Sequence, residues 1–256
     1  MVCAALAATL ARGDGAPSAP ASGPASRPAG GTGEFAPFTF LHVGDPEHGS
    51  PDLPGTAERL RRLIARANRL KPAFLAMVGD LVHGGDNPAE WKAFDDALKL
   101  SKPPVFAVPG NHDDLKQFLK RFGQEYRAFT YNNCEFVFLN SQALTKQQLA
   151  WAEGVLRTAR GEQRTHIIVV MHNPPEGNAK LSALLDKYNV EAVLCGHTHT
   201  TKQIAHKGRT TYIVSGTAKF RDSKGLTYGI VKVGRDKIEH QTVLLPPAEA
   251  DATSRP

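Results

Sequence analysis

Residues that could bind metal ions follow five of the apolar runs in this chain. Each group contains Asp, Asn or His, and most begin with Gly. The groups are Gly44-Asp45-Pro46-Glu47-His48, Gly79-Asp80, Gly110-Asn111-His112-Asp113, His172-Asn173 and Gly196-His197-Thr198-His199. Carboxylate oxygens, amide oxygens and imidazoles suit divalent ions such as Mn, Fe or Zn, and none of the groups contains a thiol. Their chemistry is that of a metal site with oxygen and nitrogen ligands.

Each group has an ordinary explanation when it is taken alone. A Gly-Asp pair after a strand is usually a turn, and Asn111 and Asp113 could begin a helix, since Asn and Asp are good caps. A lone His such as His172 is more often a hydrogen-bonded surface residue. The joint occurrence of all five groups, each at the end of a predicted strand, favours a metal site over these explanations.

Short β-rich runs alternate with amphipathic runs from residue 35 onward. Predicted strands cover residues 38–43, 74–78, 105–108, 135–139, 166–171, 190–195, 212–215, 226–233 and 237–244. Predicted helices cover residues 56–70, 88–100, 113–122, 145–160 and 181–188. This alternation indicates an α/β architecture, although antiparallel strands near the C-terminus argue against a purely parallel sheet. Because ligands of α/β sheets bind beyond the carboxyl ends of the strands, the five loops should deliver their polar residues to one edge.

Several predicted helices begin with recognisable signals. Pro88 occupies the first turn of the helix at 88–100, where its missing N–H has no cost. Thr145 is followed three residues later by Gln148, which is a capping-box pattern. Acidic residues at the start of the helix at 113–122 suit its positive end.

The order of the five groups resembles the pattern of calcineurin-like metallophosphoesterases. In that family an Asp motif, Gly-Asp, Gly-Asn-His-Asp, His and Gly-His-x-His follow one another, and the resemblance here covers about residues 38–243. It implies a central two-sheet mixed β-sandwich flanked by helices, with a dinuclear metal site at the strand ends. It also implies metal-dependent hydrolysis of a phosphate mono- or diester, in which a hydroxide shared by the two ions attacks phosphorus.

The resemblance further implies which residues bind the two divalent ions, whose identity could be Mn, Fe, Zn or Mg. Asp80 would bridge both ions. The remaining ligands of the first ion would be Asp45, His199 and the residue two positions after Asp45, and those of the second ion would be Asn111, His172 and His197. His112 would not be a ligand; it would contact a phosphoryl oxygen or protonate the leaving group. Asp113 would orient the ring of His112.

One position departs from the family pattern. The family commonly has Asp-x-His in the first motif, whereas this chain has Glu47 two residues after Asp45. Glu47 could bind the first ion, His48 could reach in one residue later, or neither could bind and the first ion would be held weakly. We favour Glu47, because a related branch of the family uses Asp-Pro-Gln at these positions. A carboxylate there would shift the preference toward harder ions such as Mn or Mg.

Two other function classes compete with a phosphoesterase. A non-catalytic metal-binding scaffold of the same fold would be expected to lose several ligands or the His of Gly-Asn-His, and this chain keeps all of them except the His of the first motif. A nuclease would be expected to carry a large basic surface. The formal net charge of +6 comes without a dense Lys/Arg block, so we predict a solvated surface and no specific nucleic-acid partner. The predicted substrate is therefore a small phosphorylated molecule, while the oligomeric state stays open.

The remaining composition narrows the class of protein. No apolar run approaches the roughly 20 residues of a membrane-spanning helix, so no such span is predicted. Cys3, Cys134 and Cys195 form no C-x-x-C pair, and the last two lie in apolar runs where small buried side chains are expected. His83, which lies three residues after Asp80, is expected either in the pocket or on the surface. His42 is expected to be packed within its strand.

Both ends of the chain differ from the predicted domain at residues 35–246. Residues 1–11 are apolar and Ala-rich like the middle of a secretory signal, but they lack a positively charged leader, so a disordered end fits equally well. Residues 12–34 are dominated by Pro, Ala, Gly and Ser, which predicts a disordered tether. Residues 247–256 are predicted to form a disordered tail. Two locations follow from these alternatives: an exported or periplasmic enzyme, or a cytoplasmic one.

Overall fold

The computed structural model describes residues 35–46, 56–199, 202–206, 210–214 and 226–245. The predicted signal-like segment and tether at residues 1–34 and the predicted tail at 247–256 lie outside the described residues. Glu47 and His48 also lie outside them. The structure therefore tests most of the predicted domain but neither of its flanking segments.

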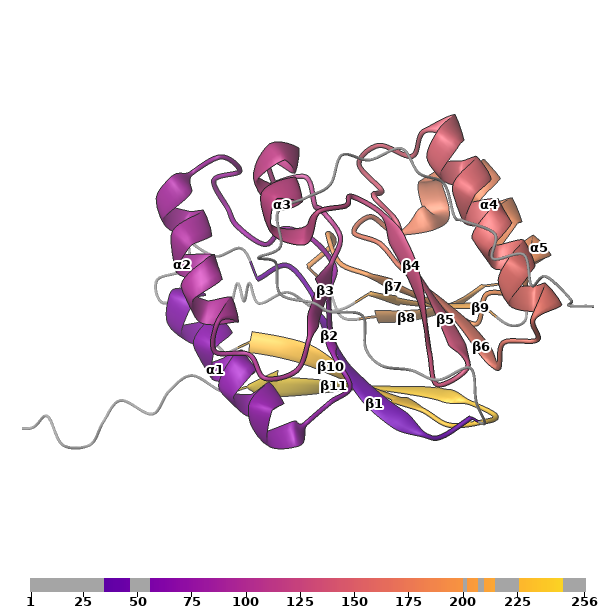
Figure 1. Ribbon diagram of the computed structural model, residues 1–256, viewed down its shortest axis with the longest axis horizontal. Coiled ribbons are helices and arrows are strands. Elements are labelled where there is room, and N and C mark those ends of the chain that lie inside the picture. Colours follow the sequence, from indigo (N-terminus) through magenta and orange to yellow (C-terminus); the bar gives the residue numbers. More distant parts are fainter. Residues whose placement is uncertain (1–34, 47–55, 200–201, 207–209, 215–225, 246–256) are drawn as a thin grey trace, which may run out of the picture.

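Strands of the described part form two mixed sheets that pack face to face (Figure 1). The first sheet contains β1 (Phe38–Val43), β2 (Leu75–Met77), β3 (Val105–Ala107), β10 (Leu226–Val233) and β11 (Ile238–Leu245). The second contains β4 (Arg127–Tyr131), β5 (Cys134–Phe138), β6 (His166–Val170), β7 (Ala192–Cys195), β8 (Lys202–His206) and β9 (Thr210–Val214). Their orders are β11-β10-β1-β2-β3 and β4-β5-β6-β7-β9-β8. The predicted two-sheet mixed sandwich is confirmed.

Helices cover the outer faces of both sheets (Figure 1). They are α1 (Thr56–Leu70), α2 (Pro88–Leu98), α3 (Leu115–Phe122), α4 (Lys146–Gly161) and α5 (Ala179–Lys187), together with the short 3-10 helix η1 (Pro175–Gly177). Strands β1, β2 and β3 run parallel, and so do β5, β6 and β7. Crossover helices therefore return the chain to the start of each following strand, and the carboxyl ends of neighbouring strands meet at one edge.

An aromatic core fills the space between the two sheets. Phe40 of β1 stacks on Phe74 with ring centroids 4.9 Å apart, and Phe136 of β5 meets the edge of Phe74 at 5.0 Å. The neighbours of Phe40 in β1, Leu41 and Val43, belong instead to the cluster under α1 and α2. This alternation follows from the pleat of a strand, which sends successive side chains to opposite faces. It explains why β1 is apolar at nearly every position.

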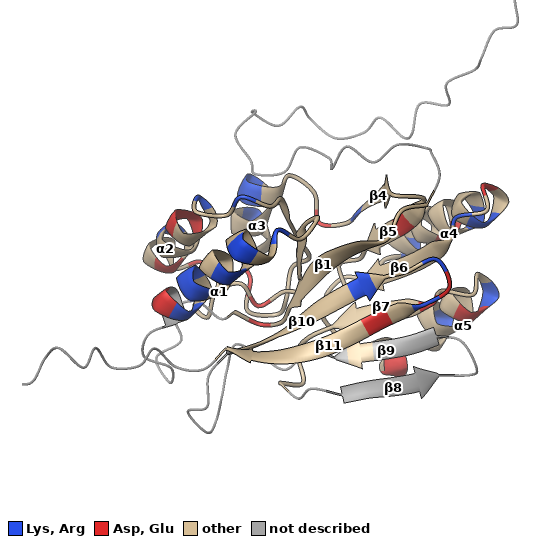
Figure 2. Cartoon of the chain, turned by 90° about the horizontal axis from the view of Figure 1, so that it is seen from below, with Lys and Arg blue, Asp and Glu red and all other residues tan. Residues whose placement is uncertain are grey.

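Helix α1 shows where part of the positive charge lies. Its face toward the sheet buries Leu60, Leu63 and Ile64. Arginines occupy much of the remaining surface of α1, and Lys and Arg positions are spread over the other helices too (Figure 2). The helix is thus an ordinary amphipathic cover with a solvated basic face. Within the described residues, no helix combines the length and the apolar composition that crossing a membrane requires.

Two strands were missed by the sequence prediction. Strand β4 pairs antiparallel with β5 through a turn at Asn132 and Asn133, whose φ angles are 42° and 59°. Asn tolerates this left-handed region, and such two-residue turns match the twist of a hairpin. The pair of Asn residues between two β-rich runs was therefore a usable signal. Strand β8 pairs antiparallel with β9, and the three residues between them in the sequence include Gly208, which was also a usable hairpin signal.

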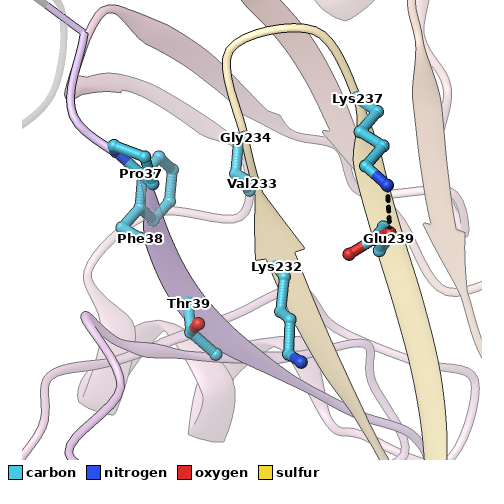
Figure 3. A pocket seen from close by; sticks show the side chains of 8 residues that line it. All are labelled: Pro37, Phe38, Thr39, Lys232, Val233, Gly234, Lys237 and Glu239. Carbon is cyan, nitrogen blue, oxygen red and sulfur yellow. Dashed lines mark hydrogen bonds and ion pairs between the residues drawn. The ribbon is translucent and has the colours of Figure 1, made fainter.

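A small hollow lies at the opposite end of β1 from the predicted metal ligands (Figure 3). It has a volume of about 280 Å³ and is lined by residues at the start of β1 and around the β10–β11 turn, including Phe38, Lys232 and Lys237. Lys237 forms an ion pair with Glu239 beside it. Because Asp45 follows the last residue of β1, this hollow is separate from the predicted site.

A pair of histidines meets across β10. Nδ1 of His42 on β1 lies 3.2 Å from Nε2 of His240 on β11, and His42 is fully buried. Burial is the main reason that the pKa of His42 lies well below its usual value and that the pKa of His240 is lowered to about 4. Both rings are therefore neutral near neutral pH in the folded protein.

The contribution of His240 to folding stability should become less favourable as the pH drops below about 6.5, the pKa of an unperturbed His. Between that value and about 4, the unfolded chain binds a proton at His240 that the folded chain does not bind. This difference costs about 1.4 kcal/mol per pH unit. We expect the stability difference between wild type and His240→Gln, measured by urea unfolding, to change by about 2 kcal/mol between roughly pH 7 and pH 5. A difference that stays constant with pH would contradict this expectation.

Candidate metal centre

The structure brings six of the seven predicted ligands together at the carboxyl ends of β1, β2, β3, β6 and β7, while Glu47 lies outside the described residues. Two groups of side chains have ligand atoms within 4.8 Å of one another: Asp80 with His172 and His197, and Asp45 with Asp80 and His199. Asp80 belongs to both groups, as a bridging ligand must. The roles of these residues as metal ligands stay a prediction, but their convergence is a property of the fold.

Nε2 of His172 lies at the centre of the first group. It is 3.0 Å from Oδ1 of Asn111, 3.2 Å from Nδ1 of His197 and 3.3 Å from Oδ2 of Asp80. The other ring nitrogen, Nδ1, lies 2.7 Å from the carbonyl oxygen of Val78, which can only accept a hydrogen bond. Nδ1 therefore carries the proton, and the lone pair of Nε2 points into the group.

This arrangement fits a cation. In the neutral ring, the lone pair of His172 Nε2 faces Oδ1 of Asn111 and Oδ2 of the ionised Asp80, and neither oxygen carries a hydrogen to donate. Several acceptor atoms that face one another need a proton or a metal ion between them. Burial would lower the pKa of His172, but its hydrogen bond with Asp80 and the charges of Asp80 and Asp45 outweigh burial and raise it. The donor set of oxygen and nitrogen atoms suits a divalent ion.

Asp45 forms the base of the second group. It is fully buried, and both of its oxygens accept from the backbone N–H of His197, at 2.9 and 3.2 Å. Burial raises the pKa of Asp45 to about 7, against the opposing effect of nearby His172. Burial would also raise the pKa of Asp80, but its hydrogen bond with His172 and the charge of that ring lower it. The two carboxylates thus sit in different environments within one site.

Strained backbone presents four of the ligands. The φ angles are 36° at Asp45, 48° at Asp80, 68° at His197 and 54° at His199. Residues other than Gly rarely adopt this left-handed region, and clusters of them are found at functional sites. Each of these residues lies directly after a strand or in the turn that follows it. The sharp turn aims the side chain back over the end of the sheet.

Glycines before the ligands allow neighbouring loops to approach closely. A Cβ on Gly79, which has φ of 91°, would lie 2.7 Å from both the backbone N of Gly110 and Nδ1 of His172. A Cβ on Gly196 would lie 2.8 Å from Oδ2 of Asp45. The Gly before Asp80 and the Gly before His197 are thus required by packing against other members of the same site.

We expect Gly79→Ala to lower the free energy of unfolding by about 1–3 kcal/mol, because it adds both backbone strain and a steric clash. It should also weaken Mn²⁺ binding, because His172 or the Gly110 loop must move. Chemical unfolding and a Mn²⁺ titration of metal-free protein measure the two effects. Gly154→Ala is the matched control: Gly154 lies in α4 with no atom within 4 Å of an added Cβ, so Ala should stabilise the helix slightly. Equal behaviour of the two variants would contradict the packing role.

His112 lies beside the ligands without joining either group. Its backbone N–H donates to Oδ1 of Asp80 at 2.9 Å. Its ring Nδ1 lies 3.0 Å from the carbonyl oxygen of His83, so Nδ1 carries the proton and donates. The ring also stacks on the ring of His83, with centroids 5.2 Å apart. The carbonyl of His83 and the stacked His83 ring thus fix the orientation of the His112 ring.

Asp113 does not orient the ring of His112, contrary to the prediction. Its Oδ1 accepts from the backbone N–H groups of Leu81 at 2.8 Å and Val82 at 3.2 Å, and its Oδ2 accepts from Gly110 at 2.9 Å. These N–H groups belong to the loops that follow β2 and β3. Buried backbone N–H groups need an acceptor, and the carboxylate of Asp113 supplies it. Burial raises the pKa of Asp113 to about 7 although the three N–H donors oppose it. Asp113 therefore joins the loops that carry Asp80 and Asn111.

Helix α3 starts later than predicted for the same reason. Asp113 is engaged with the site, and Asp114 serves as N-cap by accepting from the N–H of Gln117 at 2.9 Å. The helix then begins at Leu115, whereas the prediction began it at 113.

The loop after β2 contains residues that the sequence prediction did not assign. Glu90 accepts from the backbone N–H groups of His83 at 3.1 Å and Gly84 at 2.7 Å, and so holds the segment whose carbonyl fixes His112. Asn87 caps α2 by accepting from Ala89. Asn87, Pro88 and Glu90 form a cap pattern with an acid at the third helical position, and this pattern was a usable signal for an ordered loop.

This chain is similar to known proteins over more than half of its length. A family model for calcineurin-like phosphoesterases matches residues 38–201. A probable glycerophosphodiester phosphodiesterase GpdQ of Arcobacter nitrofigilis is 29% identical over 174 residues, covering 55% of this chain and 62% of that protein. The human serine/threonine-protein phosphatase CPPED1 is 24% identical over 252 residues, covering 81% of this chain and 80% of that protein. This chain thus spans less than two thirds of the first of these relatives.

A solved structure supports the fold. A dimetal phosphatase from Danio rerio superimposes with a TM-score of 0.67 at 15% sequence identity, covering 81% of this chain and 98% of that one. The two sheets and flanking helices of this chain thus have a counterpart with the same architecture. At 15% identity the likeness shows the fold and says nothing about the substrate.

Proposed function

Because the chain belongs to the calcineurin-like phosphoesterase family, we propose that it hydrolyses phosphate mono- or diesters with the help of two divalent metal ions. The family uses a dinuclear centre, and the observation that carries the proposal is the position of Asp80. Its carboxylate is shared by two groups of candidate ligands, one around His172 and one around Asp45.

The proposed ligands divide between the two groups. Asp80, Asn111, His172 and His197 would hold one ion, and Asp45, Asp80 and His199 would hold the other. Glu47, two residues after Asp45, is proposed as the further ligand of the ion that Asp45, Asp80 and His199 would hold. Bound divalent ions would neutralise charge on the phosphoryl oxygens and lower the pKa of an attacking water. The buried carboxylates and oriented imidazoles of the chain would fix the positions of the bound ions.

His112 is proposed to act on the substrate. Its Nδ1–H donates to the carbonyl of His83, so a second proton on Nε2 makes the ring an imidazolium. This imidazolium can donate to a phosphoryl oxygen or to the leaving oxygen as negative charge develops there. Stacking on His83 and the bond from its own N–H to Asp80 hold the ring beside the ligands.

Small phosphorylated molecules are the proposed substrates. The relatives are named as a glycerophosphodiester phosphodiesterase and as a protein phosphatase, so both diesters and monoesters belong in the test. The experiment is metal analysis followed by a screen of phosphomonoesters, phosphodiesters and cyclic nucleotides with Mn²⁺-loaded protein. We expect hydrolysis that disappears on chelation and returns with Mn²⁺. A metal-loaded protein without activity on either ester class would favour the alternative, a non-catalytic metal-binding scaffold.

A further inference from the structure

A buried histidine connects the two sheets directly behind the candidate metal centre. His42 lies on β1, three residues before Asp45, and its ring is fully buried. Nε2 of His42 lies 3.1 Å from the carbonyl oxygen of Cys195, the last residue of β7. Cys195 directly precedes the Gly196-His197-Thr198-His199 turn. The ring of His42 thus reaches from the first sheet to the backbone that begins this turn.

The hydrogen-bond pattern defines which nitrogen carries the proton. A carbonyl can only accept, so Nε2 of His42 must donate to Cys195. Burial keeps the ring neutral, so Nδ1 is the acceptor and Nε2–H of His240, 3.2 Å away, must donate to it. The result is a directed chain of hydrogen bonds from His240 through His42 to Cys195.

Gly229 makes room for this chain. It lies opposite His42 in the pairing of β1 with β10, and a Cβ at Gly229 would overlap Nε2 of His240. Gly in a strand interior usually weakens the strand and often marks a close approach. Here the close approach is that of the His240 ring, which crosses β10 to reach His42.

Two hydrogen bonds join the end of β1 to the end of β7. One is the bond from His42 to the carbonyl of Cys195, and in the other the N–H of His197 donates to the carboxylate of Asp45 at 2.9 Å. The end of β1 and the end of β7 are therefore tied at two successive points, His42 to Cys195 and Asp45 to His197. Asp45, His197 and His199 all lie immediately beyond the first of these ties.

We propose that His42 is a positioning residue for the metal centre: its Nε2–H holds the carbonyl of Cys195 and thereby places the turn that carries His197 and His199. His240 and Gly229 keep its ring in the tautomer that can do this. This inference rests on the proposed metal site, but it concerns residues that touch neither metal nor substrate.

The first test is Mn²⁺ binding to metal-free protein, measured by calorimetry alongside thermal unfolding. His42→Leu should stay folded and lose about 10–100-fold in Mn²⁺ affinity, the usual effect of removing a group that orients a ligand. His42→Gln retains an N–H at the end of its side chain and should recover most of the affinity. If His42→Leu binds Mn²⁺ like wild type, or if a folded His42→Gln binds as weakly as His42→Leu, the proposal is wrong.

The matched control is His166→Leu. His166 is also a buried histidine whose Nε2 lies close to a carbonyl, that of Gly234 at 2.8 Å, but it begins β6 and so lies at the other end of this strand from His172. Its substitution should change stability and leave Mn²⁺ affinity unchanged. An equal loss of affinity in His166→Leu would show that general destabilisation, not the turn, explains the effect.

A second measurement needs no variant with altered packing. Nitrogen NMR of the imidazole rings in wild-type protein should show His42 as the neutral Nε2–H tautomer, with a bare Nδ1. An Nδ1–H tautomer or an imidazolium at His42 would overturn the proposal even if every substitution prevented folding. Failure of the proposed function is distinguishable, because wild-type protein would then bind no Mn²⁺ or hydrolyse no ester, whatever the state of His42.

Discussion

Substitution of Asp80 by Ala is expected to abolish most hydrolysis, by roughly three orders of magnitude, since the charge stabilisation supplied by bound metal ions amounts to several kcal/mol. Asp80 is the one residue common to both groups of candidate ligands, so its loss should disturb both ions. It also accepts from the backbone of His112 and lies 3.3 Å from His172. Metal analysis of the purified variant should therefore find less than the wild-type content.

Two further variants test whether the loss of activity comes from the charge of Asp80. Asp80→Asn keeps an oxygen for the N–H of His112 but lacks the charge, so it should be nearly as inactive as Asp80→Ala. Asp96→Ala removes an exposed carboxylate on α2 that pairs with Lys92 and Lys99, and its activity should equal that of wild type. An Asp80→Asn protein with full metal content and full turnover would rule out a bridging role for the carboxylate.

The second large effect is expected at His112. His112→Ala should lower kcat by about 10²–10⁴-fold, the usual contribution of a positioned acid or base, while both metal ions remain bound. The reason is geometric: the ring lies beside the ligand groups, held by the carbonyl of His83, but belongs to neither group. Metal content and steady-state kinetics on the same preparation separate the two effects.

Leaving-group dependence can identify what the ring of His112 does. If it protonates the leaving oxygen, the loss in His112→Ala should be much smaller for a nitrophenyl ester than for an alkyl ester, because nitrophenolate leaves without a proton. If it donates to a phosphoryl oxygen, the loss should be similar for both esters. Wild-type turnover of both esters by the variant would refute a catalytic role.

The ligand positions could be predicted because local sequence and site packing share one cause. A ligand at a strand end needs a sharp turn, and a sharp turn beside another loop needs Gly. Gly79 and Gly196 show both requirements, since an added Cβ would strike His172 or Asp45. The Gly-Asp and Gly-His pairs in the sequence therefore indicate a site at which neighbouring loops pack closely.

Regular elements could be predicted to the extent that their own residues decide them. Helix α1 and strand β1 have the predicted bounds, because α1 has a clear apolar period and β1 is a distinct β-rich run. Strand β4 was missed although its Asn132-Asn133 turn was visible. Strand β8 was missed too, although Gly208 lies within the three residues that separate it from its antiparallel partner β9 in the sequence.

The amino-acid sequence by itself determined the donor atoms of the candidate metal centre, the strands that carry them and the family to which the chain belongs. The tertiary structure decided the partners of those groups. It placed Asp113 on the backbone of the β2 and β3 loops instead of on His112, and it joined His42 to residues 153 and 198 positions away. Donor types and turn residues are local properties, so they can be read along the chain. The partner of a buried polar group depends on which distant backbone and side-chain atoms the packed sheets bring within hydrogen-bonding distance.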